Sequence, residues 1–375
     1  MMKVVYVSNF LNHHSLPLCE EFIRNADDFT FITTDMHYSQ GYQQPVEKPY
    51  VVFSEKEPER AKRLIFDADM VIFGACPASM MEERMSANKL SFLYTERYFK
   101  RGTWRRFIPS TRRSIERRVG RYRGKDLFVL CASAFLPYDL SFFGYPIEKC
   151  LKGGYFPECK GVECEKTPRS ILWAGRMLDW KHPEVPVEVA KKLRSEGIDF
   201  TMTIVGEGPE EGRVRALIEK YALSGCVKMA GSASHEKLMD MMAEHEIFMF
   251  TSDRNEGWGA VLNEAMTNGC AVVASSAIGS VPYLIDNGEN GRIYRDGRTA
   301  EAYDAVKELL LNRELARQYG VAARESMKNY DYRTFVKRIM ELSGHFLQAG
   351  EILRYDSGVL SPAELIKDNW FKERK

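Results

Sequence analysis

The sequence has no CxxC pair among its eight cysteines, and no apolar run approaches the ~18 residues of a membrane-spanning helix. The missing cysteine pairs argue against a zinc site or a redox dithiol. Charge of one sign is not in excess: the formal net charge of +1 argues against a chain that binds nucleic acid along its whole surface. The first segment turns polar at Ser8 and is too short for a signal peptide. We therefore expect a cytoplasmic protein with reduced thiols.

What is present is a steady alternation of short apolar runs with longer amphipathic stretches. This pattern is typical of βαβ units on a parallel sheet, so it predicts an α/β fold. Residues 152–168 interrupt it with glycine, proline and charge at no regular period, which indicates a linker between two series of strands. A chain of 375 residues is long enough for two such domains. We predict an N-terminal domain over 1–165, a second domain over 166–345, and a C-terminal segment, 346–375, that docks back on the domains.

The strongest motif is NEGWG at 255–259, which follows the apolar strand 246–252 and precedes a helix predicted from about Gly259. Ligands of open parallel sheets bind beyond the carboxyl ends of the strands. Amide groups at the start of a helix, beside residues without side chains, favour an anion. Glu256, and Glu264 within the helix, are better suited to accept hydrogen bonds from hydroxyl groups. The alternative is one Glu placed by the helix dipole and a second that is solvated.

Two further strand ends carry candidate loops. Arg176 directly follows the strand ILWAG, and Lys181 comes five residues later. Two cations on one such loop suit a diphosphate, with ordinary surface charge as the alternative. Gly206 and Gly208 lie in the loop VGEGPE, and their spacing to Gly212 is GxGxxxG rather than GxGxxG. No acid ends the next strand either, so we reject a dinucleotide-cofactor site and predict a tight turn.

Taken in order, the segments AGRMLDWK, VGEGPE, NEGWGAVLNEAM and CAVVASSAIGSVP resemble the retaining family-4 glycosyltransferases of the GT-B fold. The resemblance spans residues 168–295 and implies two Rossmann-like parallel-sheet domains that face each other across a cleft. It also implies a nucleotide-diphosphate sugar as donor, held without a metal ion or a cofactor. The chain departs from the family's pattern at Pro282-Tyr283, where a Gly-Glu pair is usual, and at 9–14, where the family often has a glycine-rich loop.

The resemblance also implies roles for residues of the second domain. Arg176 and Lys181 would neutralise the donor diphosphate, and Glu256 would hold the sugar. Glu264 would bind the ribose, and Ser232 would lie near the base. The implied residues are Glu256, Arg176 and Lys181 for catalysis, and Gly175, Gly206, Gly208, Ser232, Gly257, Trp258, Gly259 and Glu264 for donor binding.

The first domain offers candidates on the acceptor side. Asn12, His13 and His14 follow the first strand, so we expect them at the carboxyl edge of the first sheet. His13 would bind the acceptor hydroxyl or the departing phosphate, with helix capping or packing as the alternative. Glu96, which ends a later strand, would orient or deprotonate an acceptor hydroxyl.

A basic run covers residues 97–125, with twelve lysines or arginines against one acid, Glu116. Ile115, Val119 and Tyr122 fall at helical spacing within it. Such a segment suits an anionic membrane surface or a lipid-pyrophosphate acceptor, and a solvated basic face is the alternative. The twelve residues are Arg97, Lys100, Arg101, Arg105, Arg106, Arg112, Arg113, Arg117, Arg118, Arg121, Arg123 and Lys125.

These observations predict a retaining, metal-independent glycosyltransferase that uses a nucleotide-diphosphate sugar, with uridine as the family's commonest base. The acceptor would be a glycan or a lipid-linked hydroxyl in the synthesis of a bacterial-type surface polysaccharide or glycolipid. A nucleotide-sugar epimerase of the same fold and a non-catalytic sugar-nucleotide-binding protein stay open as alternatives. We expect a cytoplasmic location, extended to the inner face of the plasma membrane if the basic run docks there, and no nucleic-acid partner.

Overall fold

The computed structural model describes residues 2–12, 15–35, 48–159, 161–162 and 164–372. The chain forms two compact units: Met1–Glu158 with Asn329–Lys367, and Cys159–Lys328 with Asp368–Lys375. The chain therefore passes between the units three times. No helix within the described ranges is both long and apolar enough to cross a bilayer.

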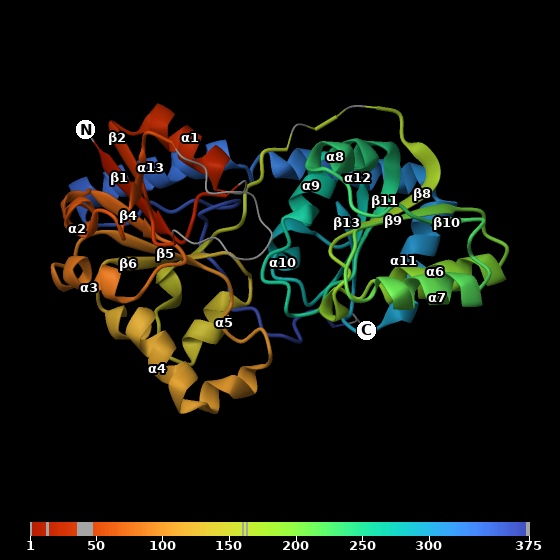
Figure 1. The fold of residues 1–375 in the computed structure, drawn as a ribbon, viewed down its shortest axis with the longest axis horizontal. Coiled ribbons are helices and arrows are strands. Elements are labelled where there is room, and N and C mark those ends of the chain that lie inside the picture. Colours follow the sequence, from red (N-terminus) through yellow and green to blue (C-terminus); the bar gives the residue numbers. More distant parts are fainter. Residues whose placement is uncertain (1, 13–14, 36–47, 160, 163, 373–375) are drawn as a thin grey trace. The chain divides into compact units, whose positions relative to one another are not determined.

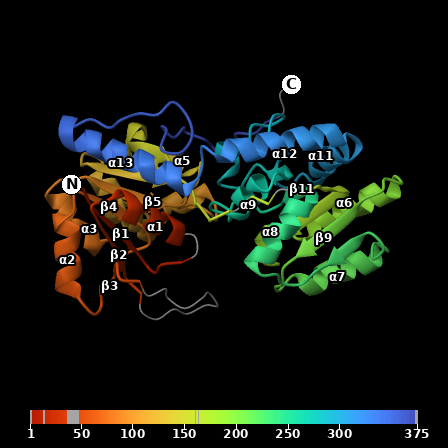
Figure 2. The same ribbon diagram turned by 90° about the horizontal axis from the view of Figure 1, so that it is seen from above.

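The first unit is built on a seven-stranded sheet in the order β3-β2-β1-β4-β5-β6-β7, with every neighbouring pair parallel. Helices lie on both of its faces (Figures 1 and 2), so the central strands are buried on both sides. The strands are β1 (Lys3–Ser8), β2 (Asp28–Thr33), β3 (Val51–Phe53), β4 (Met70–Phe73), β5 (Ser91–Thr95), β6 (Leu127–Cys131) and β7 (Cys150–Lys152). The helices are α1 (Leu16–Asn25), α2 (Pro58–Asp67), α3 (Ser79–Ser86), η1 (Thr103–Phe107), α4 (Pro109–Arg118), η2 (Gly120–Tyr122), α5 (Leu136–Ser141), η3 (Ile147–Lys149) and α13 (Tyr332–Ala349), where η marks a 3₁₀-helix.

The second unit is built on a six-stranded parallel sheet in the order β10-β9-β8-β11-β12-β13. Its strands are β8 (Thr167–Ala174), β9 (Thr201–Val205), β10 (Val227–Met229), β11 (His245–Phe250), β12 (Ala271–Ser275) and β13 (Gly291–Tyr294). Its helices are η4 (Asp179–Lys181), α6 (Glu184–Ser195), α7 (Glu211–Lys220), α8 (His235–Glu244), α9 (Val261–Thr267), α10 (Val281–Leu284), α11 (Thr299–Leu311) and α12 (Arg313–Met327). Figure 1 shows helices above and below these strands as well.

Both sheets reverse their strand order at one place, between β1 and β4 in the first unit and between β8 and β11 in the second. Loops that leave the carboxyl ends of two such strands diverge to opposite faces of the sheet, which opens a crevice for ligands. The predicted α/β organisation with two parallel sheets is confirmed, and it identifies the loops after β8 and β11 as the place to look for a site.

Helix α13 belongs to the first unit, whereas the sequence placed residues up to 345 in the second domain. Its apolar residues Phe335, Val336, Ile339 and Leu342 recur at helical spacing and are buried, and the helix packs against α1 (Figure 2). The periodicity that predicts an amphipathic helix does not say which sheet it covers. The observed division therefore differs from the predicted boundaries at 166–345 and 346–375.

The predicted C-terminal segment returns to both units. Leu151 and Pro362 form an antiparallel bridge in the first unit. Farther on, Asp368 forms a 2.9 Å ion pair with Arg254 in the second unit. The Trp370 Nε1 donates a hydrogen bond to the Ser276 carbonyl oxygen, at 2.9 Å. The last part of the chain therefore touches the loops that follow β11 and β12.

A buried arginine holds together the segments that lead into β4 and β5 of the first sheet. Arg84 is fully buried in α3 and donates hydrogen bonds to five backbone carbonyl groups and to Ser91 Oγ. Burial lowers the pKa of Arg84 to about 10. The carbonyl groups belong to the end of α2 and to the segments before β4 and β5, so one side chain ties three elements together.

Candidate functional site

The loops after β8 and β11 are joined by a small hydrogen-bond network. The Thr251 hydroxyl, just past β11, donates to the Lys181 carbonyl oxygen at 2.7 Å. It accepts a hydrogen bond of 2.8 Å from the indole of Trp173, a buried residue of β8. The Asp253 amide donates to the Trp180 carbonyl oxygen at 2.9 Å. The network sets the position of both loops beside the strand-order reversal.

Two predicted site residues meet in this place. The Lys181 ammonium lies 2.6 Å from a carboxylate oxygen of Glu256, and both side chains are largely shielded, with 14% and 12% of their surface exposed. The Ser252 hydroxyl donates to the same Glu256 oxygen at 3.0 Å. The sequence assigned Lys181 to the diphosphate and Glu256 to the sugar. Their ion pair means that a ligand phosphate would compete with Glu256 for the lysine.

Arg176 lies on the same loop and is exposed. In the part of the chain that the structure describes, its guanidinium has no carboxylate within ion-pair distance, unlike Lys181. Its neighbour Gly175 donates its backbone amide to the Val205 carbonyl oxygen. The loop therefore presents one arginine whose five N–H groups are available to an anion.

The glycines of the loop after β9 are required for packing. Gly206 has a φ of +128°, and a Cβ there would lie 1.9 Å from the Gly175 carbonyl oxygen. Gly208 has a φ of +154°, and a Cβ there would lie 2.5 Å from the Met177 carbonyl oxygen. The predicted tight turn is confirmed, because only glycine lets this loop lie against the backbone of the loop after β8.

Ser232 lies in the loop after β10 and contacts a residue that the sequence analysis did not single out. Both its amide and its hydroxyl donate to one carboxylate oxygen of Glu207, at 3.2 and 3.1 Å. Glu207 itself belongs to the glycine loop after β9. A role of Ser232 near a nucleotide base would need this bond to be kept or exchanged.

Glu264 lies in α9 and is 6% exposed, which rules out the interpretation as a solvated helix residue. Burial raises the pKa of Glu264 to about 8. The imidazole Nδ1 of His235, at the start of α8, lies 3.7 Å from a carboxyl oxygen of Glu264. Burial has removed the hydrogen bonds of this carboxyl group to water. The group is therefore well suited to accept hydrogen bonds from a diol.

The NEGWG loop differs from the expectation in two respects. Helix α9 begins at Val261, so the amides of Gly257 and Gly259 belong to a loop rather than to the first turn of a helix. The side chain of Trp258 is fully buried and donates to Asn263 Oδ1 at 2.9 Å, so it packs beneath the loop and only its backbone can face a ligand. Gly259 has a φ of +84°, and a Cβ there would lie 2.3 Å from the Phe250 ring.

The structure adds a third cationic group that the sequence did not suggest. His182 adopts a left-handed backbone conformation, with a φ of 48°. The carboxylates of Asp253 and Glu184 beside the ring raise the pKa of His182 to about 10. Its Nδ1 lies 3.2 Å from Glu184 and its Nε2 lies 3.7 Å from Asp253. The imidazolium therefore links the loops after β8 and β11, and only the three-dimensional contact reveals it.

The first-unit candidates give a mixed result. His13 and His14 lie outside the described residues. Asn12 and Ser15, the N-cap residue of α1, exchange hydrogen bonds between side chain and backbone amide, both 3.0 Å, so the side chain of Asn12 is engaged locally just before the helix. Glu96 forms an ion pair with Lys100.

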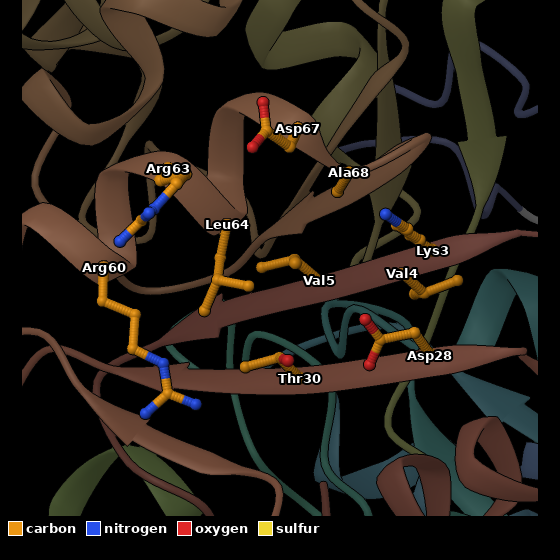
Figure 3. A pocket seen from close by; sticks show the side chains of 10 residues that line it. All are labelled: Lys3, Val4, Val5, Asp28, Thr30, Arg60, Arg63, Leu64, Asp67 and Ala68. Carbon is orange, nitrogen blue, oxygen red and sulfur yellow. The ribbon is translucent and has the colours of Figure 1, made fainter.

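A pocket of about 300 Å³ lies elsewhere in the first unit (Figure 3). Lys3 and Asp28 line it from the amino ends of β1 and β2, and Arg60, Arg63 and Asp67 line it from α2. It therefore lies at the edge of the sheet opposite the strand carboxyl ends, and it contains none of the residues predicted for a site.

Residues 160–326 match the family of glycosyl transferases group 1. A putative colanic acid biosynthesis glycosyltransferase of Salmonella typhimurium is 29% identical over 35% of this chain and 34% of its own length. An amylovoran biosynthesis glycosyltransferase of Erwinia amylovora is 31% identical over 48% of this chain and 46% of its own. The chain thus spans about a third to a half of the length of these curated relatives.

The solved structure of the Anabaena protein HepE in complex with UDP superposes with a TM-score of 0.68 at 16% identity, covering 91% of this chain and 99% of that one. This chain has the GT-B fold. The similarity in structure extends over both units, whereas the sequence match to the family is confined to the second unit. The GT-B prediction made from the four motifs is confirmed, and the sequence relationship is strongest in the unit that carries them.

Proposed function

We propose that this protein is a glycosyltransferase that moves a sugar from a nucleoside-diphosphate sugar to a hydroxyl group of a glycan or a lipid-linked acceptor. The proposal rests mainly on the position of Arg176 and of the Lys181–Glu256 ion pair. These residues lie on the loops after β8 and β11, which are hydrogen-bonded to each other where the strand order of the sheet reverses. Buried Glu264, in the helix that follows the second loop, adds an acceptor for hydroxyl groups. The match of residues 160–326 and the polysaccharide products in the relatives' names support a surface polysaccharide or glycolipid as product.

The donor would be bound by charge and by hydroxyl contacts. Arg176 offers a planar fork of donors and Lys181 a point charge, a combination that suits two adjacent phosphates. When a phosphate takes up Lys181, an oxygen of Glu256 is released from the ion pair and accepts a hydrogen bond from the sugar. Glu264 accepts hydrogen bonds from the ribose hydroxyl groups. Gly175, Gly206, Gly208, Gly257 and Gly259 shape the loops around this donor, and Ser232 lies toward the base.

In the transfer step, the bond between the anomeric carbon and the diphosphate oxygen breaks. A new bond forms between that carbon and the acceptor oxygen, and the acceptor proton passes to an oxygen of the leaving phosphate. We propose attack from the face of the leaving group, with retention of configuration. Stabilisation of the departing diphosphate by Arg176 and Lys181 is the largest catalytic contribution. The proposal assigns this work to side chains, with no metal ion and no cofactor, and keeps His13 as an acceptor-side residue.

Calorimetric titration with UDP, GDP and ADP in the presence of a chelator tests the donor site. UDP is the first choice because the HepE structure contains it. We expect one nucleotide to bind, and Arg176→Ala and Glu264→Ala each to weaken its affinity about tenfold or more, since the first removes a charge-assisted contact with the diphosphate and the second removes a buried hydrogen-bond partner of the ribose. Arg213→Ala is the matched control: Arg213 is an exposed arginine of α7, paired with Glu210, and its loss should leave affinity unchanged. If no nucleotide binds, or all three variants bind alike, the proposal is wrong.

Product analysis separates the alternatives. Incubation with the sugar nucleotide alone would yield an isomerised sugar nucleotide if the protein is an epimerase. Transfer to an added acceptor, with the anomeric configuration of the product read by NMR, identifies a glycosyltransferase and decides between retention and inversion. Nucleotide binding without turnover on a broad acceptor set would identify a non-catalytic binding protein.

A further inference from the structure

The connection between β5 and β6 carries an apolar feature that faces water. Trp104 and Phe107 are 59% and 70% exposed, and no other Trp or Phe side chain in the described ranges is exposed to a comparable degree. Both belong to η1. In a 3₁₀-helix the side chains at positions i and i+3 eclipse each other, so these two rings share one face.

The exposed rings are held in place by local contacts. Gly102 turns the chain into η1 with a φ of +113°, and a Cβ there would lie 2.7 Å from the Trp104 ring. The Trp104 Nε1 donates to the Arg101 carbonyl oxygen at 3.2 Å. The Arg106 guanidinium lies 4.6 Å from the centre of the Phe107 ring. The rings are therefore presented by a shaped turn.

Positive charge accompanies the rings along the same segment, and Arg105 and Arg106 lie against them. Of the twelve basic residues in 97–125, Arg97, Lys100, Arg121 and Arg123 form ion pairs with acids, and Arg118 donates to the carbonyl oxygens of Gly74 and Cys76. Six arginines between residues 101 and 117 have no carboxylate partner within the described parts of the chain. With the two rings they form what we call the basic–aromatic surface: Arg101, Trp104, Arg105, Arg106, Phe107, Arg112, Arg113 and Arg117.

The other side of this segment is firmly packed. Arg97 and Asp139 form a buried ion pair of 3.1 Å, and Ile115 and Val119 are buried as their helical spacing predicts. Arg118 binds the loop that follows β4, at the strand-order reversal of the first sheet. The basic–aromatic surface is therefore a fixed part of the first unit and is attached to the carboxyl edge of its sheet.

We propose that the basic–aromatic surface docks on a membrane leaflet that contains anionic lipids. The two rings would enter the interfacial layer, where aromatic side chains are favoured, and the arginines would contact lipid phosphates. A soluble acidic polymer would form ion pairs with the arginines, but it would leave the shared face of the two rings exposed to water, unlike a membrane. Docking would bring the carboxyl edge of the first sheet close to the headgroups, where a lipid-linked acceptor is found. The surface itself does not depend on the proposed transferase activity.

Co-sedimentation of the full chain with phosphatidylcholine vesicles and with mixed phosphatidylcholine–phosphatidylglycerol vesicles tests the proposal. We expect binding to the mixed vesicles only, weakened by salt. The triple variant Arg105→Gln, Arg113→Gln, Arg117→Gln should lower the partition coefficient about a hundredfold, since each basic residue contributes about fivefold. The double variant Trp104→Ser, Phe107→Ser should lower it about tenfold or more. Brominated lipid should quench tryptophan fluorescence in the wild type but much less in Trp104→Phe.

Matched controls separate a local surface from general effects. Arg213→Gln, Arg215→Gln, Arg317→Gln changes the net charge equally, at exposed arginines of the second unit. Leu311→Ser, Val321→Ser removes apolar side chains that are 60% and 59% exposed. Both controls should bind vesicles as the wild type does. Equal loss in the controls, no preference for anionic vesicles, or binding only to a soluble acidic polysaccharide would overturn the proposal. Vesicle binding is measured without donor or acceptor. Its result therefore does not depend on whether the protein is a glycosyltransferase.

Discussion

Glu264 is a carboxyl group that the second unit keeps from water, and its burial gives stability a pH dependence of definite sign. Its pKa is about 8 in the folded protein, against an ordinary value of 4.5. Between these values the folded state binds the proton more tightly than the unfolded state does. The contribution of this group to stability is therefore fully present below pH 4.5 and is lost progressively as the pH rises to 8.

Replacement of Glu264 by Gln should remove this loss, because the amide keeps the shape and does not ionise. We expect the variant to be more stable than the wild type above pH 8, by roughly 5 kcal/mol, and the two to be similar below pH 4.5. Urea unfolding at both ends of this range measures the difference. A constant difference across the range would show that Glu264 does not titrate as proposed.

Arg84 makes a different prediction, since it is a buried cation that is satisfied by backbone oxygens. Arg84→Ala leaves several buried carbonyl groups without donors, so we expect the free energy of unfolding to fall by roughly 3–5 kcal/mol. Arg63→Ala, at an exposed position of α2, should change it by less than about 0.5 kcal/mol. Thermal unfolding that gives the two variants the same midpoint would contradict this role.

The strands and helices were largely predictable, and the contacts between loops were not. Apolar runs predict β8, β9, β11 and β12, and strand-end reasoning brings Lys181 and Glu256 to the same edge. The sequence missed β7 and β13, because strands of three and four residues carry too little pattern. It also missed His182 and Thr251, whose importance comes from contacts across the reversal. The burial of Trp258 could not be predicted either, because the other residues of the NEGWG motif were predicted to face the ligand.

The C-terminal segment contacts the loops after β11 and β12 through Asp368 and Trp370. Trp370→Ala removes the hydrogen bond to the Ser276 carbonyl oxygen and the packing of the indole, so the loops after β11 and β12 lose support. We expect the affinity for the nucleoside diphosphate to fall about fivefold, the equivalent of one hydrogen bond. Trp104→Ala, an exposed tryptophan of the first unit, is the control in the same calorimetric titration. Unchanged affinity in Trp370→Ala would show that the segment only covers the surface.

The two units differ in how much of the chain each requires. The second unit has all its strands and helices in one stretch, Cys159–Lys328, to which only Asp368–Lys375 is added, whereas the first unit needs α13 from beyond that stretch. A fragment of residues 1–158 would expose the apolar surface that Phe335 and its neighbours cover, so we expect it to aggregate or to lack fixed side-chain packing. Near-ultraviolet circular dichroism checks this. A fusion of 1–158 to 329–367 should recover the signal, and a well-folded 1–158 fragment would contradict the expectation.

The threefold passage of the chain between the units also sets an order of events on the ribosome. Synthesis runs from the N-terminus, so all strands of the first sheet emerge before the second unit, yet α13 emerges after it. The surface of the first unit that α13 covers therefore stays uncovered while residues 159–328 are synthesised and begin to fold. The first unit is thus completed only after the second unit has been made, and until then this apolar surface stays exposed to water.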